Sequence, residues 1–123
     1  MATIHRFEDI LGWQRARILT RLIYDMSTDS SFSKDFALRD QIRRAAISIM
    51  LNIAEGFARR TDKDFARFLS NSHGSAAEVQ SALYIALDQD YISDSEFKDA
   101  YNLCEECSKL VFGFSQYLSR EKV

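Results

Sequence analysis

Basic side chains are the residues of this chain whose type and spacing most clearly suggest a binding chemistry. Residues 39–67 carry seven basic and four acidic side chains, a local net charge of +3, whereas residues 78–106 carry eight acids and one Lys, giving −7. A basic patch binds phosphate groups without sequence preference and in a salt-dependent way. The candidate nucleic-acid or anion-binding residues are Arg43, Arg44, Arg59, Arg60, Lys63 and Arg67.

Part of this basic charge is expected to be neutralised within the chain. Glu55 precedes Arg59 by four residues, the favourable spacing for an ion pair on a helix. Phe65 and Phe68 fall on an apolar helix face, so no aromatic ring is interleaved with the basic residues as a base-stacking surface would require. The alternative interpretation is that the charged segments are solvated helix faces without a nucleic-acid partner.

Neither an acid–base site nor a metal site is predicted. Asn52 and Glu55 lie close together, but a lone Glu without a nearby His or second acid is a poor acid–base catalyst. We therefore expect no catalytic residue and no enzymatic activity. The same helix carries a set of polar side chains that we expect to form a structural network of lateral hydrogen bonds, namely Gln41, Ser48, Asn52 and Glu55.

Cys104 and Cys107 form a CxxC pair, which can indicate redox or zinc chemistry. Redox pairs lie at helix N-termini, where the helix dipole lowers the thiol pKa, whereas this pair lies well inside a predicted helix. A structural zinc site needs four ligands, and the chain offers only His5 and His73 in addition. We expect two buried small apolar side chains, with no metal and no cofactor.

Hydrophobic periodicity predicts four helices that would position these groups. They span about 7–26, 35–59, 61–89 and 93–120, and a polar break separates the first two at residues 27–31. Thr61 with Asp64 and Ser93 with Glu96 have the spacing of capping boxes. Short connections force neighbouring helices to run antiparallel. The sequence therefore predicts one all-α domain over residues 1–123, an antiparallel up-down-up-down four-helix bundle, with a close helix approach at Gly74-Ser75-Ala76-Ala77.

The second predicted helix is apolar on more of its circumference than a bundle core requires. Its first apolar stripe includes Ile42, Ile49 and Ile53, and a second stripe lies about 100–120° away on a helical wheel. Two apolar stripes indicate two packing partners, one within the chain and one outside it. The candidate oligomer interface is the second stripe, Ile47, Met50, Leu51, Ala54 and Ala58.

A set of short motifs spread along the chain carries a family resemblance. They include Phe7–Leu11, Trp13-Gln14, Leu38, Gln41–Ala46, Ser48-Ile49, Asn52–Gly56, Phe68-Leu69 and Gly74-Ser75. With these motifs the chain resembles the four-helix-bundle family formerly called S23 ribosomal protein, or 23S rRNA intervening-sequence protein, which is related to the accessory variability protein of diversity-generating retroelements. The resemblance implies an antiparallel four-helix bundle and a ring-like homopentamer. It also suggests a role beside rRNA or another RNA.

Composition agrees with a small globular protein and adds an expected compartment. No apolar run reaches the length of a membrane span, the N-terminus lacks the apolar core of a signal peptide, and the chain has two cysteines. We expect a cytoplasmic protein without membrane contact. The predicted function is a non-enzymatic oligomeric accessory module associated with RNA or with an RNA-associated protein. The alternative is a homo-oligomeric protein–protein adaptor without nucleic-acid binding.

Overall fold

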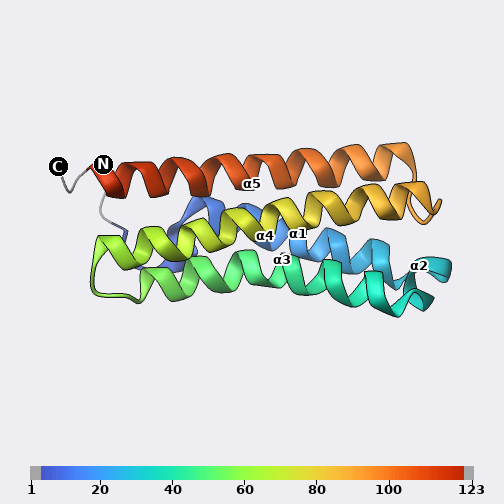
Figure 1. The fold of residues 1–123 in the computed structure, drawn as a ribbon, viewed down its shortest axis with the longest axis horizontal. Helices are drawn as coiled ribbons and strands as arrows, with labels where there is room; N and C mark the ends of the chain where they lie inside the picture. Colours follow the sequence, from blue (N-terminus) through green and yellow to red (C-terminus); the bar gives the residue numbers. More distant parts are fainter. Residues whose placement is uncertain (1–3, 121–123) are drawn as a thin grey trace.

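The computed structural model describes residues 4–120 and contains helices but no strand in that range (Figure 1). The all-α prediction is confirmed. A short 3₁₀ turn and a five-residue helix, α2, accompany the four long helices. No helix in residues 4–120 has both the length and the apolar character that a membrane span requires. The elements are η1 Phe7–Asp9, α1 Leu11–Thr28, α2 Ser30–Lys34, α3 Phe36–Phe57, α4 Asp62–Asp88 and α5 Asp94–Arg120.

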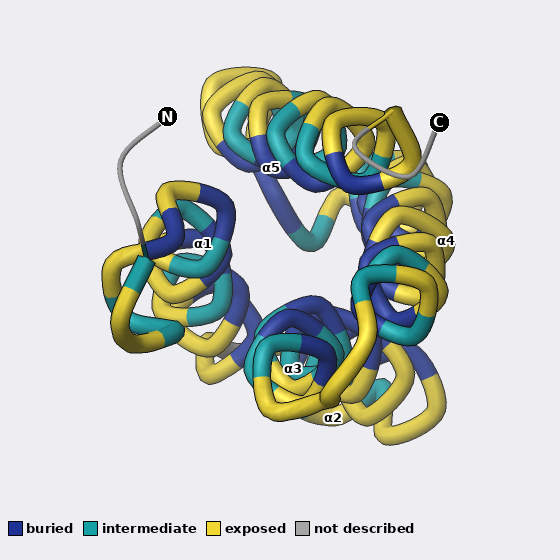
Figure 2. The backbone as a smooth tube through the Cα atoms, turned by 90° about the vertical axis from the view of Figure 1, so that its left-hand side faces the viewer, coloured by how far each residue is buried: buried dark blue, intermediate teal, exposed yellow. Residues whose placement is uncertain are grey.

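The four long helices lie side by side around a shared core. Figure 1 shows the chain colours running in alternating directions along α1, α3, α4 and α5. Helix α3 packs against α4 and α4 against α5, while α1 contacts both α3 and α5. Seen along the helices, the buried side of each one faces the centre of the group (Figure 2). The largest fully buried side chains of this shared core include Leu19, Ile23, Ile42, Ile49, Ile53, Leu69, Val79, Leu83 and Val111.

Side-chain caps fix where α3, α4 and α5 begin. The Thr61 hydroxyl accepts a hydrogen bond of 3.1 Å from the backbone N–H of Asp64. At the start of α5, Ser93 and Glu96 exchange side-chain-to-backbone hydrogen bonds in both directions, at 2.8 and 3.1 Å. Both pairs satisfy N–H groups that a helix end leaves without a partner. The Asp35 carboxylate caps α3 in the same way.

The connection between α1 and α3 carries a buried aromatic side chain directly after the polar break predicted at residues 27–31. Phe32 in α2 is 1% exposed, and its ring stacks on Tyr91 with 5.3 Å between ring centroids. The Tyr91 hydroxyl donates a hydrogen bond of 3.0 Å to the Asp35 carboxylate, and this bond raises the tyrosine pKa. Thus α2 closes one end of the core by contact with the segment between α4 and α5.

Of the four glycines, Gly56 lies in the tightest helix contact, whereas the sequence favoured the segment that begins at Gly74. A Cβ atom on Gly56 would lie 2.8 Å from Cβ of Phe68 and 2.9 Å from Cδ1 of Phe65. At Gly74 the same atom would meet nothing within 4 Å. The absence of a Cβ on Gly56 therefore allows the end of α3 to pack against the start of α4.

We expect Gly56→Ala to lower the free energy of unfolding by about 1–3 kcal/mol, because the added methyl group forces Phe65 and Phe68 to shift. Gly74→Ala is the matched control, since it adds the same group to open space in a helix. It should raise stability by up to about 1 kcal/mol through helix propensity. Urea unfolding monitored by circular dichroism measures the stability of both variants. Equal changes in the free energy of unfolding would contradict the close helix contact at Gly56.

Candidate nucleic-acid interface

The turn between α3 and α4 gathers four of the six candidate basic residues at one end of the molecule. Helix α3 ends at Phe57 and α4 begins at Asp62, so the chain reverses within a few residues. The four side chains are exposed and come from the turn and the first two turns of α4. We call this group the turn cluster; it consists of Arg59, Arg60, Lys63 and Arg67.

A buried aromatic ring supports two members of the turn cluster. The guanidinium carbons of Arg59 and Arg67 lie 4.6 and 4.7 Å from the ring centroid of Phe68. Phe68 is only 7% exposed, so it orders these cations but offers no face on which a base could stack. Sequence reasoning placed Phe68 on the core face, and its contact with both cations was missed.

Within residues 4–120, two members of the turn cluster form ion pairs and two do not. Arg59 forms an ion pair with Glu55 at 2.8 Å, and Arg67 lies 3.6 Å from a carboxylate oxygen of Asp64. Neither Arg60 nor Lys63 forms an ion pair with a described residue. These two exposed cations are the groups most accessible to an anionic ligand.

Arg43 and Arg44 lie away from the turn cluster. By the helical rise of 1.5 Å per residue, they are about 20 Å from the end of α3. The Arg43 guanidinium donates a 2.8 Å hydrogen bond to the Ser27 hydroxyl and lies 4.4 Å from the ring centroid of Tyr24. It therefore links α3 to α1 and is half-buried, whereas Arg44 is exposed. The six candidate residues do not form one continuous surface.

The polar side chains of α3 bond laterally to α4. The Ser48 and Ser75 hydroxyls are 2.8 Å apart, and the Asn52 amide donates to the Ser48 hydroxyl at 3.0 Å. Gln41 donates to the Glu78 carboxylate at 3.1 Å. Glu55 bonds along its own helix to Arg59 instead of across it. The Asn71 amide on α4 also donates to the Asn52 carbonyl oxygen at 3.5 Å, so Gln41, Ser48 and Asn52 join α3 to α4.

The candidate oligomer interface is only partly exposed in the single chain. Leu51 is 61% exposed and Ala58 is also exposed, whereas Ile47, Met50 and Ala54 are half-buried. The Met50 sulfur accepts a hydrogen bond from the Thr20 hydroxyl at 3.4 Å, so part of this stripe packs on α1. Leu51 is the one large apolar side chain of this stripe that is exposed, since Ile47 and Met50 are half-buried.

The chain is similar in sequence to one protein family and in fold to a solved structure. The model of the 23S rRNA-intervening sequence protein family matches residues 8–113. The chain belongs to this family. Its fold is similar to the crystal structure of an S23 ribosomal protein family member of unknown function from Bacteroides thetaiotaomicron, with a TM-score of 0.78 and 22% sequence identity, over 85% of this chain and 98% of that one. No curated protein matches the chain.

The cysteines of this 23S rRNA-intervening sequence family member lie in the core. Both are fully buried and form no disulfide, and the Cys104 thiol donates to the Ala76 carbonyl at 3.2 Å. Burial raises the pKa of each thiol to about 12, so both stay protonated near neutral pH and are poor nucleophiles. His73 is exposed and lies 5.5 Å from the Phe112 ring. No group of three or more potential metal ligands occurs within the described part of the chain.

Proposed function

We propose that the protein is a non-enzymatic, self-assembling antiparallel four-helix bundle that accompanies RNA in the cytoplasm and contacts it through the turn cluster. The observation that carries the proposal is the exposure of Arg60 and Lys63, without carboxylate partners in the described residues, beside two arginines held by Phe68. Backbone phosphates are the part of RNA that such a surface recognises. The family description, which refers to 23S rRNA, supports RNA as the polyanion.

Self-assembly would increase the effect of a small cluster. We propose a ring-shaped homopentamer in which the second stripe of α3, centred on Leu51, packs against another subunit. Leu51 is 61% exposed beside the half-buried Ile47 and Ala54, so a neighbouring subunit would bury a larger apolar surface. Each subunit would then present one turn cluster to the same RNA, and several weak contacts would act together.

The double variant Arg60→Ala/Lys63→Ala is expected to lower RNA affinity at least tenfold at about 50 mM salt, because each subunit loses two phosphate contacts. Fluorescence anisotropy of a labelled single-stranded RNA measures this. The control is Lys98→Ala/Lys109→Ala, which removes the same charge from exposed positions on α5. This control should bind within about twofold of the wild type. Equal losses of RNA affinity in the two double variants would show that RNA binding depends on the net charge of the protein and not on the turn cluster.

The alternative function is a protein–protein adaptor. Exposed apolar side chains on α4 and α5 favour it, because Tyr84, Ile85 and Phe112 are each about half exposed. Phosphate contacts are strong at about 50 mM salt. If the wild-type protein binds no RNA under that condition, the adaptor function replaces the RNA proposal.

A further inference from the structure

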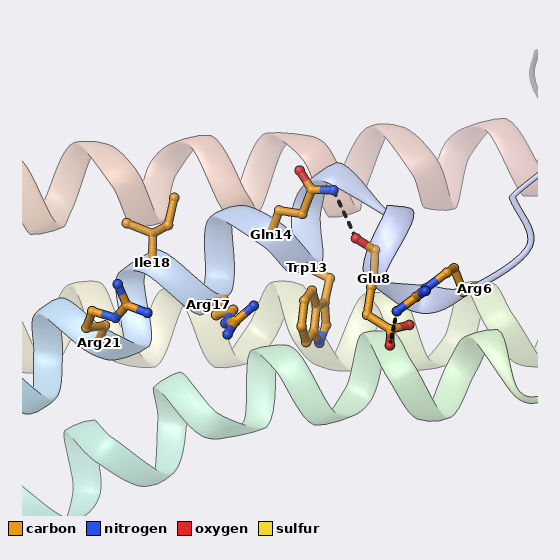
Figure 3. Close-up of a pocket in the computed structure, with 7 residues that line it drawn as sticks. All are labelled: Arg6, Glu8, Trp13, Gln14, Arg17, Ile18 and Arg21. Carbon is orange, nitrogen blue, oxygen red and sulfur yellow. Dashed lines mark hydrogen bonds and ion pairs between the residues drawn. The ribbon is translucent and has the colours of Figure 1, made fainter.

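A groove on the outer face of α1 combines an aromatic ring with basic side chains. It has a volume of about 530 Å³, and its lining includes Arg6, Glu8, Trp13, Arg17 and Arg21 (Figure 3). Trp13, Arg17 and Arg21 recur at intervals of four residues, so they lie along the same side of the helix. None of these residues belongs to the turn cluster, and α1 begins and ends outside the α3–α4 turn.

The groove carries positive charge that the described residues do not neutralise. Arg17 and Arg21 are exposed, and neither forms an ion pair with a carboxylate in residues 4–120. Like charges one helical turn apart disfavour the helix by a few tenths of a kcal/mol, and a bound anion would remove this repulsion. The one acid in the lining, Glu8, is already paired with Arg6 at 2.8 Å, which holds the pKa of that carboxyl below its usual range.

The groove also contains an aromatic surface whose position is fixed. Trp13 is half-buried, and Phe7 packs edge-on against it with 5.2 Å between ring centroids. The Arg17 guanidinium lies 5.8 Å from the centre of the Trp13 ring. The η1 turn is held to α1 by a 2.9 Å hydrogen bond from the Gln14 amide to the Glu8 carbonyl, drawn in Figure 3. These contacts pre-organise an indole ring beside the two unpaired arginines.

We infer that this groove is a second RNA contact, which binds a single-stranded segment. Trp13 stacks on one base, and Arg17 and Arg21 bind phosphates of the same strand. The two arginines are about 6 Å apart along the helix axis, so they can reach different phosphate groups. Base–aromatic stacking tolerates any base but requires that the base be free of its own duplex stack. The groove therefore distinguishes single-stranded from duplex RNA. The turn cluster cannot do so by base stacking, because its aromatic ring, Phe68, is buried.

The inference rests on the proposed function only in that RNA is the ligand. It assigns contacts that the turn cluster does not make. The chain contains one tryptophan, so fluorescence excited at wavelengths that its tyrosines do not absorb reports on this groove alone. The two sites can therefore be tested separately in the same protein.

The test is a titration of the full chain with a short oligouridylate, followed by the fluorescence of Trp13. We expect quenching by the single strand and little change with duplex RNA or with uridine monophosphate. Arg17→Ala/Arg21→Ala should weaken the quenching titration about tenfold, as expected for the loss of two phosphate contacts at low salt. Arg15→Ala is the control, because Arg15 lies on the same helix but pairs with Glu106 at 3.1 Å. It should bind within about twofold of the wild type.

A second variant tests the stacking itself. Trp13→Leu keeps an apolar side chain against Phe7 but removes the stacking face, and anisotropy of labelled RNA should show an affinity at least fivefold lower. Circular dichroism confirms that each variant is folded. The turn-cluster variant Arg60→Ala/Lys63→Ala should still show Trp13 quenching at higher RNA concentration.

Each contrary outcome has a defined meaning. RNA binding by anisotropy with no change in Trp13 fluorescence, and with Arg17→Ala/Arg21→Ala equal to Arg15→Ala, overturns the groove and leaves the turn cluster intact. Quenching by duplex RNA as strong as by the single strand overturns base stacking. Quenching by uridine monophosphate at the same concentration would show a free-nucleotide site and overturn strand binding. Absence of all RNA binding removes both proposals.

Discussion

Phe32→Ala is expected to lower the free energy of unfolding by about 3–5 kcal/mol, a large share of the total for a domain of this size. Phe32 is 1% exposed and stacks on Tyr91, so its removal leaves a cavity where α2 closes the core. The surrounding helices are too long to collapse into that space without disturbing their other contacts. Urea unfolding followed by circular dichroism measures the change.

Phe36→Ala is the matched control for this prediction. Phe36 is four residues further along the chain and 63% exposed, and its ring contacts the Arg39 guanidinium at 4.8 Å. Its loss should cost about 1 kcal/mol or less, because little apolar area returns to water. A Phe32→Ala protein as stable as Phe36→Ala would contradict the role of α2 as an anchor.

Leu51→Glu is expected to dissociate the proposed homopentamer while leaving each subunit folded. Leu51 faces outward in the single chain, so a carboxylate there is solvated in a monomer. In a dry interface the same unpaired charge would cost several kcal/mol for each contact. Light scattering after size-exclusion chromatography at micromolar concentration measures the mass of both proteins.

Ile85→Glu provides the control for assembly, because Ile85 is an exposed apolar residue on α4 outside the proposed interface. It should leave the mass unchanged. A wild-type protein that is monomeric at micromolar concentration, or a Leu51→Glu protein with the wild-type mass, would contradict the proposed interface.

Local sequence signals predicted the long helices and their caps well. Thr61 and Ser93 cap α4 and α5 at the positions that the spacing to Asp64 and Glu96 indicated. The Glu55–Arg59 pair is also present, at 2.8 Å. Each of these features depends on residues three or four apart, so the sequence contains the whole interaction.

Features that depend on distant residues could not be predicted in the same way. No role was predicted for Phe32, which follows the polar break at residues 27–31, because its partner Tyr91 is far along the chain. Arg43 looked like a ligand-binding cation, but its bonds to α1 depend on Ser27 and Tyr24. The close approach at Gly56 likewise depends on how α4 returns along α3.

The α1 groove shows a different limit. The spacing of Trp13, Arg17 and Arg21 was present in the sequence, but no binding site was predicted from it. Only the structure shows that Trp13 is half-buried beside two unpaired arginines and not enclosed. A search for aromatic and basic residues at helical spacing would have found this candidate.

The salt dependence of RNA binding tests the central claim most directly. For single strands, the slope of log affinity against log salt is about −0.7 for each phosphate contacted. The wild-type protein should therefore bind RNA measurably but weakly at about 50 mM salt and lose affinity steeply towards physiological salt. Arg60→Ala/Lys63→Ala should flatten the slope by about 1.4 per subunit engaged, whereas Lys98→Ala/Lys109→Ala should leave it unchanged. An identical slope in all three proteins, or no RNA binding by the wild type at low salt, would contradict RNA recognition through the α3–α4 turn.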